Sequence, residues 1–340
     1  MIKGNFNCIK NLFLLTINTI PMKRILGVLM LLLLITACDD GKLTVDVIDF
    51  SEVPALKCSA KDVIYKVKDA EMLFIEIPAT TFTADQTPDS TPIEVPLSST
   101  VKVVYRKYAS AASLNNVCPT VPDATPNLVE EWNATSGTIL ITATAIKTTN
   151  ATTGFTKITG YKYYIVFQNI TFNKPGGVQQ TYDTFVFGNY STSTSPLAFG
   201  FNHVVDKSTC AGDNRIFDFS GGEVFTLDVA NYATLFESVV TTTPRTALIS
   251  ADNKLSYRLY SNAITNDYFC ASPTPLTPTL TQEWDAVNGI AATSGIIEVT
   301  TTTFGSGFQH TIRLKNVTLK KGNSDFTLGN DYLFGTLLTN

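Results

Sequence analysis

The chain has 340 residues, which is long enough for two ordinary domains with substantial cores. Charged residues make up 16% of the chain, well below the roughly 25% of a typical globular protein. Thr and aromatic residues are abundant instead, a composition that favours strands over helices. The formal net charge is −4 and no run of Lys or Arg occurs, so we expect no nucleic-acid partner.

The N-terminal part of the chain has the features of an export signal. Met22-Lys23-Arg24 is a basic start, and an apolar stretch of 13 residues follows at 25–37. That length suits the core of a signal peptide and is short for a membrane span. Residues 3–21 fit no part of such a signal, so we expect translation to begin at Met22. An ordinary secretory signal and a short anchor helix are the alternatives.

The apolar stretch ends in Leu34-Ile35-Thr36-Ala37-Cys38, which resembles the bacterial lipobox. The resemblance implies that residues 1–38 are the signal-peptide region and that Cys38 is lipidated, palmitate being one of its acyl chains. The following Asp39-Asp40 looks like the acidic export tag of surface lipoproteins of the Bacteroidota. Aspartate at this position retains enterobacterial lipoproteins at the inner membrane. We expect the cell outer membrane, and leave its surface and periplasmic faces both open.

Two blocks of the remaining chain are nearly the same. The first runs from Tyr105 to Trp132 and the second from Tyr257 to Trp284, with every matching residue 152 positions later. The same offset holds without a gap through the preceding strand-like segments. The chain is therefore an internal duplication, with predicted domains at 39–192 and 193–340.

Period-two alternation and β-branched residues predict about seven strands in each copy. In the first copy they lie at 43–47, 63–67, 72–77, 103–108, 138–147, 161–171 and 184–187. In the second copy they lie at 197–201, 215–219, 224–229, 255–260, 296–303, 311–319 and 331–334. Between the second cysteine of each copy and its tryptophan, several prolines indicate an irregular connection, for which we expect a short helical turn at 128–132.

The two copies differ in length at two places. The second copy gains about six residues near 287–292 and loses about eleven before Thr311. Insertions and deletions of this kind predict surface loops.

The fold class that these elements predict is all-β. Many short strands, almost no amphipathic helix and regular turn signals favour two tandem homologous β-sandwich domains. They are immunoglobulin-like only loosely, because the tryptophan follows both cysteines, whereas in an antibody domain it falls between them. A barrel is the alternative.

The cysteines repeat with the copies. Cys58 and Cys118 are 60 positions apart, as are Cys210 and Cys270. An even number in an exported chain implies disulfides, and the equal spacing predicts one within each copy, Cys58–Cys118 and Cys210–Cys270. Pairing across copies is the alternative. A zinc site is disfavoured because the cysteines lie far apart singly and the two histidines hold non-equivalent positions, so we expect no metal and no cofactor.

The sequence offers little catalytic chemistry. No Gly-x-Ser-x-Gly elbow, phosphate-binding loop or calcium-binding loop occurs, and no histidine recurs between the copies. We therefore expect no catalytic residues and no enzyme. The less favoured alternative is a glycoside hydrolase that would use a pair of the repeated acids, which are Glu71 with Glu223, Glu76 with Asp228, and Glu131 with Glu283.

The two tryptophans allow two interpretations. In the structural one, each Trp fills one end of the core near the disulfide, while Glu131 and Glu283 pair with Arg106 and Arg258. In the functional one, Trp, Tyr and Arg form a platform on which a sugar ring stacks. The candidate ligand-binding residues are then Trp132, Trp284, Arg106, Arg258, Tyr108 and Tyr260.

The combined pattern favours a non-catalytic binding or adhesion protein of the cell envelope, held to the membrane by its lipid, with a polysaccharide as a candidate ligand. In general form it resembles the tandem-sandwich glycan-binding lipoproteins of Bacteroidota polysaccharide uptake systems, although no motif in the domains ties it to them. The alternative is a structural or assembly subunit of an envelope protein complex. Such a subunit would expose an apolar patch at the same place on both copies.

Overall fold

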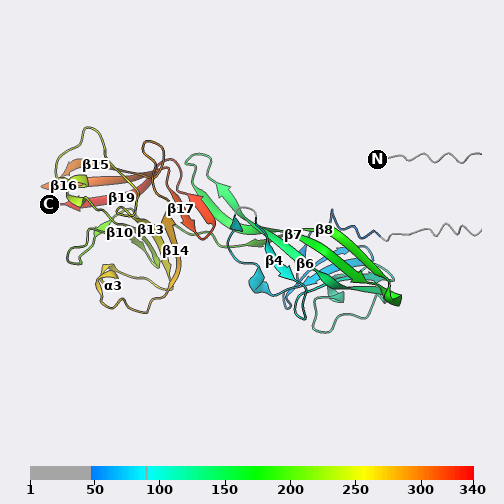
Figure 1. Ribbon diagram of the computed structural model, residues 1–340. Helices are drawn as coiled ribbons and strands as arrows, with labels where there is room; N and C mark the ends of the chain where they lie inside the picture. The colour runs from blue at the N-terminus through cyan, green and yellow to red at the C-terminus, as the bar shows by residue number, and fades with distance from the viewer. Residues whose placement is uncertain (1–46, 89–90) are drawn as a thin grey trace, which may run out of the picture. The chain divides into compact units, whose positions relative to one another are not determined.

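The computed structural model describes residues 47–88 and 91–340. Cys38, the acidic pair after it and most of the predicted strand at 43–47 lie outside these residues. Phe50–Asn340 forms one compact unit whose regular elements are mostly antiparallel strands (Figure 1). No helix within the described part of the chain is long and apolar enough to cross a membrane.

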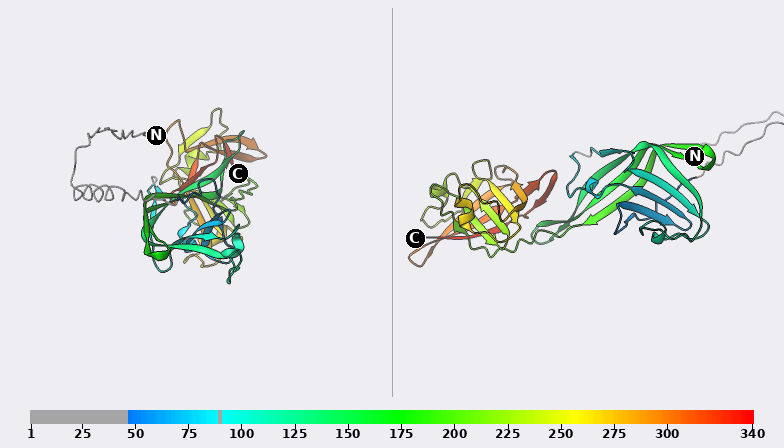
Figure 2. Two further views of the ribbon diagram at one scale, coloured as in Figure 1. Left: turned by 90° about the vertical axis from the view of Figure 1, so that its right-hand side faces the viewer. Right: turned by 90° about the horizontal axis from the view of Figure 1, so that it is seen from below.

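The first copy forms one sheet of eight strands, in the order β1-β2-β3-β5-β6-β7-β8, with β4 paired to the second half of β6. The strands are β1 (Leu56–Lys57), β2 (Val63–Lys68), β3 (Glu71–Glu76), β4 (Ile93–Pro96), β5 (Lys102–Tyr108), β6 (Leu128–Thr149), β7 (Thr156–Asn173) and β8 (Gln179–Ser193). Short 3-10 turns lie at Ala79–Thr81, Leu114–Asn116 and Pro175–Gly177. Figure 2 shows the sheet curving over, from its blue first strands to its long green last strands.

The second copy divides the same strands between two sheets, in the orders β18-β17-β14-β13-β11-β10-β9 and β12-β15-β16-β19. The strands are β9 (Asp206–Lys207), β10 (Ile216–Ser220), β11 (Glu223–Leu227), β12 (Arg245–Leu248), β13 (Leu255–Tyr260), β14 (Leu280–Ala286), β15 (Ile296–Phe304), β16 (Gly307–Lys315), β17 (Thr318–Lys321), β18 (Ser324–Thr327) and β19 (Tyr332–Thr339). Two short helices, α2 (Tyr232–Leu235) and α3 (Asn266–Cys270), complete it. Fully buried residues of both sheets, such as Tyr257 and Ile312, share one core, so this copy is a β-sandwich.

The predicted insertion near 287–292 explains why one copy has one sheet and the other two. In the first copy, β6 passes from one layer to the other without a break, bending at Gly137, whose φ is +136°. A side chain there would meet the backbone of Ile170. In the second copy, the inserted residues separate the equivalents of the two halves of β6, which are β14 and β15. The all-β tandem-sandwich prediction is confirmed.

Both predicted disulfides are confirmed. Cys58 bonds to Cys118 and Cys210 to Cys270, and each pair has its Cα atoms 5.2 Å apart. In the first copy, Cys58 belongs to a small buried cluster that also contains Tyr108 and Val117. The disulfide thus fastens the segment after β5 against the outer face of the sheet, away from the sandwich core.

Two local predictions were wrong. Residues 128–132 form the start of β6, paired with β5, and not a helical turn. This segment alternates in burial because it completes the sheet edge beside β5. The predicted strand at 197–201 does not form, since Phe199 has a left-handed φ of +52°, although Phe201 still enters the core.

Candidate functional site

Both tryptophans lie in the core. Trp132 is 2% exposed and Trp284 is 4% exposed. The indole N–H of Trp132 donates to Glu130 Oε2 at 3.0 Å, and that of Trp284 donates to Gln282 Oε1 at 3.1 Å. Each indole is therefore satisfied by the side chain two positions before it, and neither ring presents a face as a platform.

The predicted Arg–Glu pairs form in both copies. Arg106 Nε donates to Glu131 Oε2 at 2.7 Å, and Arg258 Nε donates to Glu283 Oε1 at 2.8 Å. Burial acts to raise the pKa of Glu131, but hydrogen bonds from Asn133 and Arg106 hold it below its ordinary value. These arginines are thus engaged within the sheet.

The six candidate ligand-binding residues do not come together. Trp132 is opposite Tyr105 in the β5–β6 register, with ring centroids 4.6 Å apart on the core side. Arg106 and Tyr108 follow Tyr105 by one and three positions, so their side chains point to the other face of the sheet. Tyr108 is buried there at 6% exposure, and Tyr260 at 7% holds the same place in the second copy.

The repeated acids are occupied by intramolecular bonds. Glu223 accepts hydrogen bonds from the N–H groups of Phe199 and Gly200, both at 2.9 Å, and from the Tyr257 hydroxyl. The other pairs are Glu71 with Tyr105 at 2.9 Å, Glu76 with Lys102 at 3.0 Å, Asp228 with Arg215 at 2.7 Å, and the two Arg–Glu pairs above. The repeated acids therefore make hydrogen bonds and ion pairs within and beside the sheets.

An unexpected feature is the hairpin between β6 and β7, which joins the first copy to the second. Thr327 N–H donates to Thr156 Oγ1 at 2.8 Å, and Asn330 N–H donates to the Thr153 carbonyl at 3.0 Å. Phe155 packs against the second copy's core. The residues that the second copy lacks before Thr311 correspond to this hairpin, whose tip is exposed as the predicted surface loop. The hairpin also contacts the second copy, and we call it the clasp.

A second contact lies between Asp85 and the β17–β18 turn. Asp85 Oδ1 accepts hydrogen bonds from Ser324 N–H at 2.8 Å, Ser324 Oγ at 2.7 Å and Asn323 N–H at 3.1 Å. Burial opposes ionisation, but these bonds hold the pKa of Asp85 below its ordinary value. The turn passes through Gly322 at φ +58°, where a Cβ would clash with the Asp85 carboxylate.

The clasp borders a hollow that we call the junction groove. Its volume open to water-sized molecules is about 550 Å³, within the roughly 300–1,000 Å³ of typical small-molecule sites. It is lined by Thr148, Thr149, Asn150, Thr153, Phe155, Lys157, His203, Leu328, Asp331, Tyr332 and Leu333. Residues of both copies therefore form its walls.

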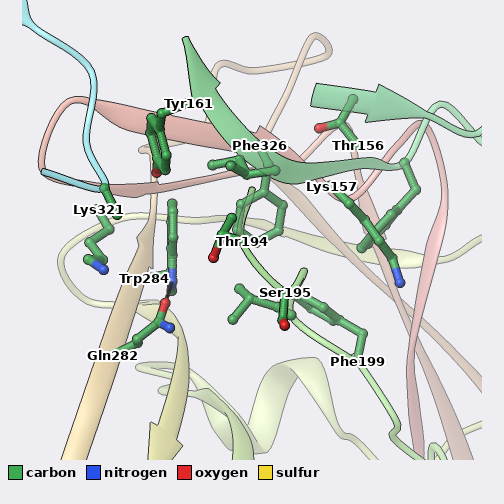
Figure 3. A pocket seen from close by; sticks show the side chains of 14 residues that line it. Thr156, Lys157, Tyr161, Thr194, Ser195, Phe199, Gln282, Trp284, Lys321 and Phe326 are labelled. Atoms are coloured by element: carbon green, nitrogen blue, oxygen red, sulfur yellow. Dashed lines mark hydrogen bonds between the residues drawn. The ribbon is translucent and has the colours of Figure 1, made fainter. Parts of the chain in front are cut away.

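On the other side of Phe155 and Lys157 lies a smaller hollow, the tryptophan cavity, of about 70 Å³ by the same measure (Figure 3). Buried Tyr161, Trp284 and Phe326 form its interior, and Thr194, Ser195 and Lys321 are exposed at its rim. Its small size admits a substituent of a ligand and not a whole sugar ring.

Behind the junction groove lies a buried carboxylate. Asp218 is 1% exposed; its Oδ2 accepts the His203 N–H at 3.2 Å, and its Oδ1 has no hydrogen-bond partner among the described residues. Burial raises the pKa of Asp218 to about 7. Burial, followed by the charge of Asp218, raises the pKa of Tyr332. Two residues of the junction groove therefore interact with the Asp218 carboxylate: His203 by a hydrogen bond, and Tyr332 electrostatically.

Of the six candidate ligand-binding residues predicted from the sequence, only Trp284 lines either hollow. Phe155, Lys157 and Tyr332 were not recognised, because the repeat draws attention to what the copies share. The signal that could have found them is the length difference before Thr311. Within the described ranges, no group of three or more His, Cys, Asp or Glu side chains is placed to hold a metal ion. No protein-family model, curated protein or solved structure matches this chain.

Proposed function

We propose that this chain is an exported, lipid-anchored protein of a bacterial cell envelope that binds a saccharide non-catalytically in the junction groove. The observation that carries the proposal is the groove itself, a hollow of ligand size built where two β-sandwich copies meet. Binding sites are common at such domain junctions.

The groove lining suits a saccharide because it combines hydroxyl and amide groups with aromatic surface. Thr148, Thr149 and Thr153 provide exposed hydroxyls. Phe155 and Tyr332 lie nearly parallel, with an interplanar angle of 27° and centroids 6.3 Å apart, and form an aromatic wall. Directed hydrogen bonds to sugar hydroxyls, with apolar contact to the ring, are the interactions this lining supplies.

Asn150 is the best-positioned donor in the groove. Its Oδ1 accepts the N–H groups of Thr152 at 2.9 Å and Thr153 at 3.1 Å, which fixes the side chain within its turn. The side-chain NH₂ group makes no hydrogen bond to any described residue. A held amide with two available N–H groups can bond a sugar hydroxyl without losing much side-chain entropy.

The envelope location rests on the sequence. The lipobox-like ending at Cys38 and the acidic residues Asp39-Asp40 support a lipid anchor, and the membrane is then a partner through that lipid. We place the protein at the outer membrane.

A second candidate function is a subunit of an envelope protein complex. Leu128 is 48% exposed and Leu280 is 42% exposed, and they hold the same position in the two copies. Val121, at 82%, and Leu276, at 92%, are exposed in the connections that precede them. Leu128 and Leu280 are a repeated pair of exposed apolar side chains that a docking subunit would use, with Val121 and Leu276 as further exposed aliphatic surface nearby in sequence.

The test is affinity electrophoresis of the full-length protein in a neutral detergent, in gels containing a panel of polysaccharides. We expect at least one polymer to retard it, and Asn150→Asp to weaken that retardation roughly 5- to 10-fold, because it keeps the Oδ1 turn contacts and removes the NH₂ donors. Asn173→Asp, at an exposed site at the other end of β7, is the matched control and should bind normally.

Equal weakening in both variants would indicate a charge effect and not a groove contact. If no polymer retards the protein, the saccharide proposal fails. Co-purification of an envelope protein that is lost in Leu128→Ser/Leu280→Ser would then favour the assembly function.

A further inference from the structure

We infer that the saccharide is acidic, a uronate-containing chain whose carboxylates are held by Lys157 and Lys321 on either side of the tryptophan cavity. This inference rests on the proposed function and adds the chemical class of the ligand. It also assigns a role to the smaller hollow, which is too small for a whole sugar ring and could take only a substituent such as a carboxylate.

The charged side chains that line the tryptophan cavity are both positive, and the nearby Asp85 carboxylate is engaged by the Asn323 and Ser324 N–H groups. The cavity lining contains Lys157 and Lys321 and no Asp or Glu. Among residues 47–88 and 91–340, no carboxylate forms an ion pair with either ammonium group. Some other lysines are paired with a carboxylate, as Lys102 is with Glu76 and Lys147 with Asp325. The cavity therefore carries two cationic groups whose N–H donors are open to a ligand.

Aromatic rings hold both ammonium groups near the cavity. Lys321 Nζ lies 5.4 Å from the centroid of the Trp284 ring, and Lys157 Nζ lies 5.8 Å from that of Phe155. A cation–π contact of this kind contributes modestly to position and consumes none of the N–H donors. An approaching carboxylate would gain charge-assisted hydrogen bonds from a partly preorganised donor.

The arrangement favours a chain with several carboxylates over a molecule with one. In Figure 3, Lys321 and Lys157 lie toward opposite ends of the cavity, with Trp284 and Phe326 between them. Lys157 also lines the junction groove. A polymer lying from Lys321 across the rim at Thr194 and on to Lys157 would meet a cation at each end and continue into the groove.

The side chains that line the junction groove present little uncompensated negative charge to a polyanion on this path. The one carboxylate of that lining, Asp331, accepts from Arg313 Nε at 2.7 Å and lies 2.9 Å from Lys315 Nζ. Arg313 thus pairs with Asp331, and Lys315 is shared between Asp331 and Glu298, whose Oε2 lies 3.3 Å from its Nζ. Because the whole chain carries a net charge of −4, indiscriminate attraction of a polyanion is disfavoured, and retention of one would point to a local site.

The experiment compares polygalacturonate with its fully methyl-esterified form, which keeps the sugar backbone and removes the carboxylate charge. We expect the full-length protein in neutral detergent to bind the acid form at least 10-fold more tightly, with an affinity that falls as salt is raised. Lys157→Gln and Lys321→Gln should each weaken binding about 5-fold, and the double variant about 20-fold or more.

Lys174→Gln is the matched control. Lys174 holds the position of Lys321 in the first copy, with its Nζ 4.1 Å from the centroid of Trp132, and it lines neither hollow. Its substitution should leave binding unchanged, and circular dichroism of all four variants should match the wild type. Equal loss in Lys174→Gln would show a non-local charge effect and overturn the inference.

Two further outcomes separate this inference from the proposed function. Equal binding of acid and esterified polymers, weakened by Asn150→Asp and not by the lysine variants, would overturn the acidic-ligand inference and leave the saccharide site standing. Absence of binding to every polymer, neutral or acidic, would remove both.

Discussion

Lys66 and Asp218 occupy equivalent positions in the two copies, yet they carry opposite charges. Lys66 is 2% exposed, and its Nζ donates to the Phe50 carbonyl at 2.9 Å. Asp218 accepts the His203 N–H. The Phe50 carbonyl and the His203 N–H belong to corresponding peptide groups, so each copy fastens the same backbone segment through a different atom. Residue-by-residue comparison of the copies cannot reveal this shared role, because it depends on the orientation of one peptide.

Asp218 should make stability fall as pH rises from acid to neutral. Its pKa is raised from 3.8 to about 7 in the folded protein, so between these values the folded chain holds a proton that the unfolded chain has lost. The contribution of Asp218 to the free energy of unfolding is fully present below about pH 4 and is lost as the pH approaches 7. The total loss is roughly 4 kcal/mol. We therefore expect Asp218→Asn to be relatively more stable than the wild type at pH 8 than at pH 5.

Urea unfolding of both proteins between pH 4 and 8 checks this. His310, whose pKa burial lowers, produces a slope of the opposite sign, but it is common to both proteins and cancels in the difference. Parallel stability curves over this range would show that Asp218 is ionised at pH 5 and would contradict the account.

At the scale of elements, the sequence predicted what period-two patterning and repetition control. Strands, disulfide partners and the Arg–Glu pairs followed from alternation and from the common offset. Cross-strand register did not, because a single sequence does not say which residue of β6 is opposite Tyr105. For that reason Trp132 was grouped with Arg106 and Tyr108, although it lies on the other face. The helical turn expected at 128–132 failed for the same reason, since pairing with β5 decides that segment.

Asp85 should be the main polar contact of the β17–β18 turn. Replacing it with Ala leaves the N–H groups of Asn323 and Ser324 without their acceptor, and we expect the free energy of unfolding to fall by about 1–3 kcal/mol. Asp85→Asn keeps one acceptor oxygen and should lose less. Urea unfolding measures both, and equal stability of Asp85→Ala and the wild type would show that the contact contributes nothing.

At the scale of the whole molecule, the duplication produces one junction and not two equal sites. Only the first copy has the long β6–β7 hairpin, and the second closes the equivalent β15–β16 hairpin between Phe304 and Gly307. The first-copy wall of the junction groove is therefore made by residues in which the copies differ. A search for features common to both copies finds residues that stabilise the sheets, such as Trp132 and Glu131. It misses Phe155, because this residue has no counterpart in the second copy.

Hydrogen–deuterium exchange of the full-length protein, with and without the polysaccharide that retards it most strongly, tests the junction site most directly. The account predicts slower exchange in two segments that are far apart in sequence, 148–157 and 328–333, with unchanged exchange in the connections at 118–127 and 270–279. Protection confined to those connections, or no protection at a saturating concentration of the polymer, would contradict a saccharide site at the junction.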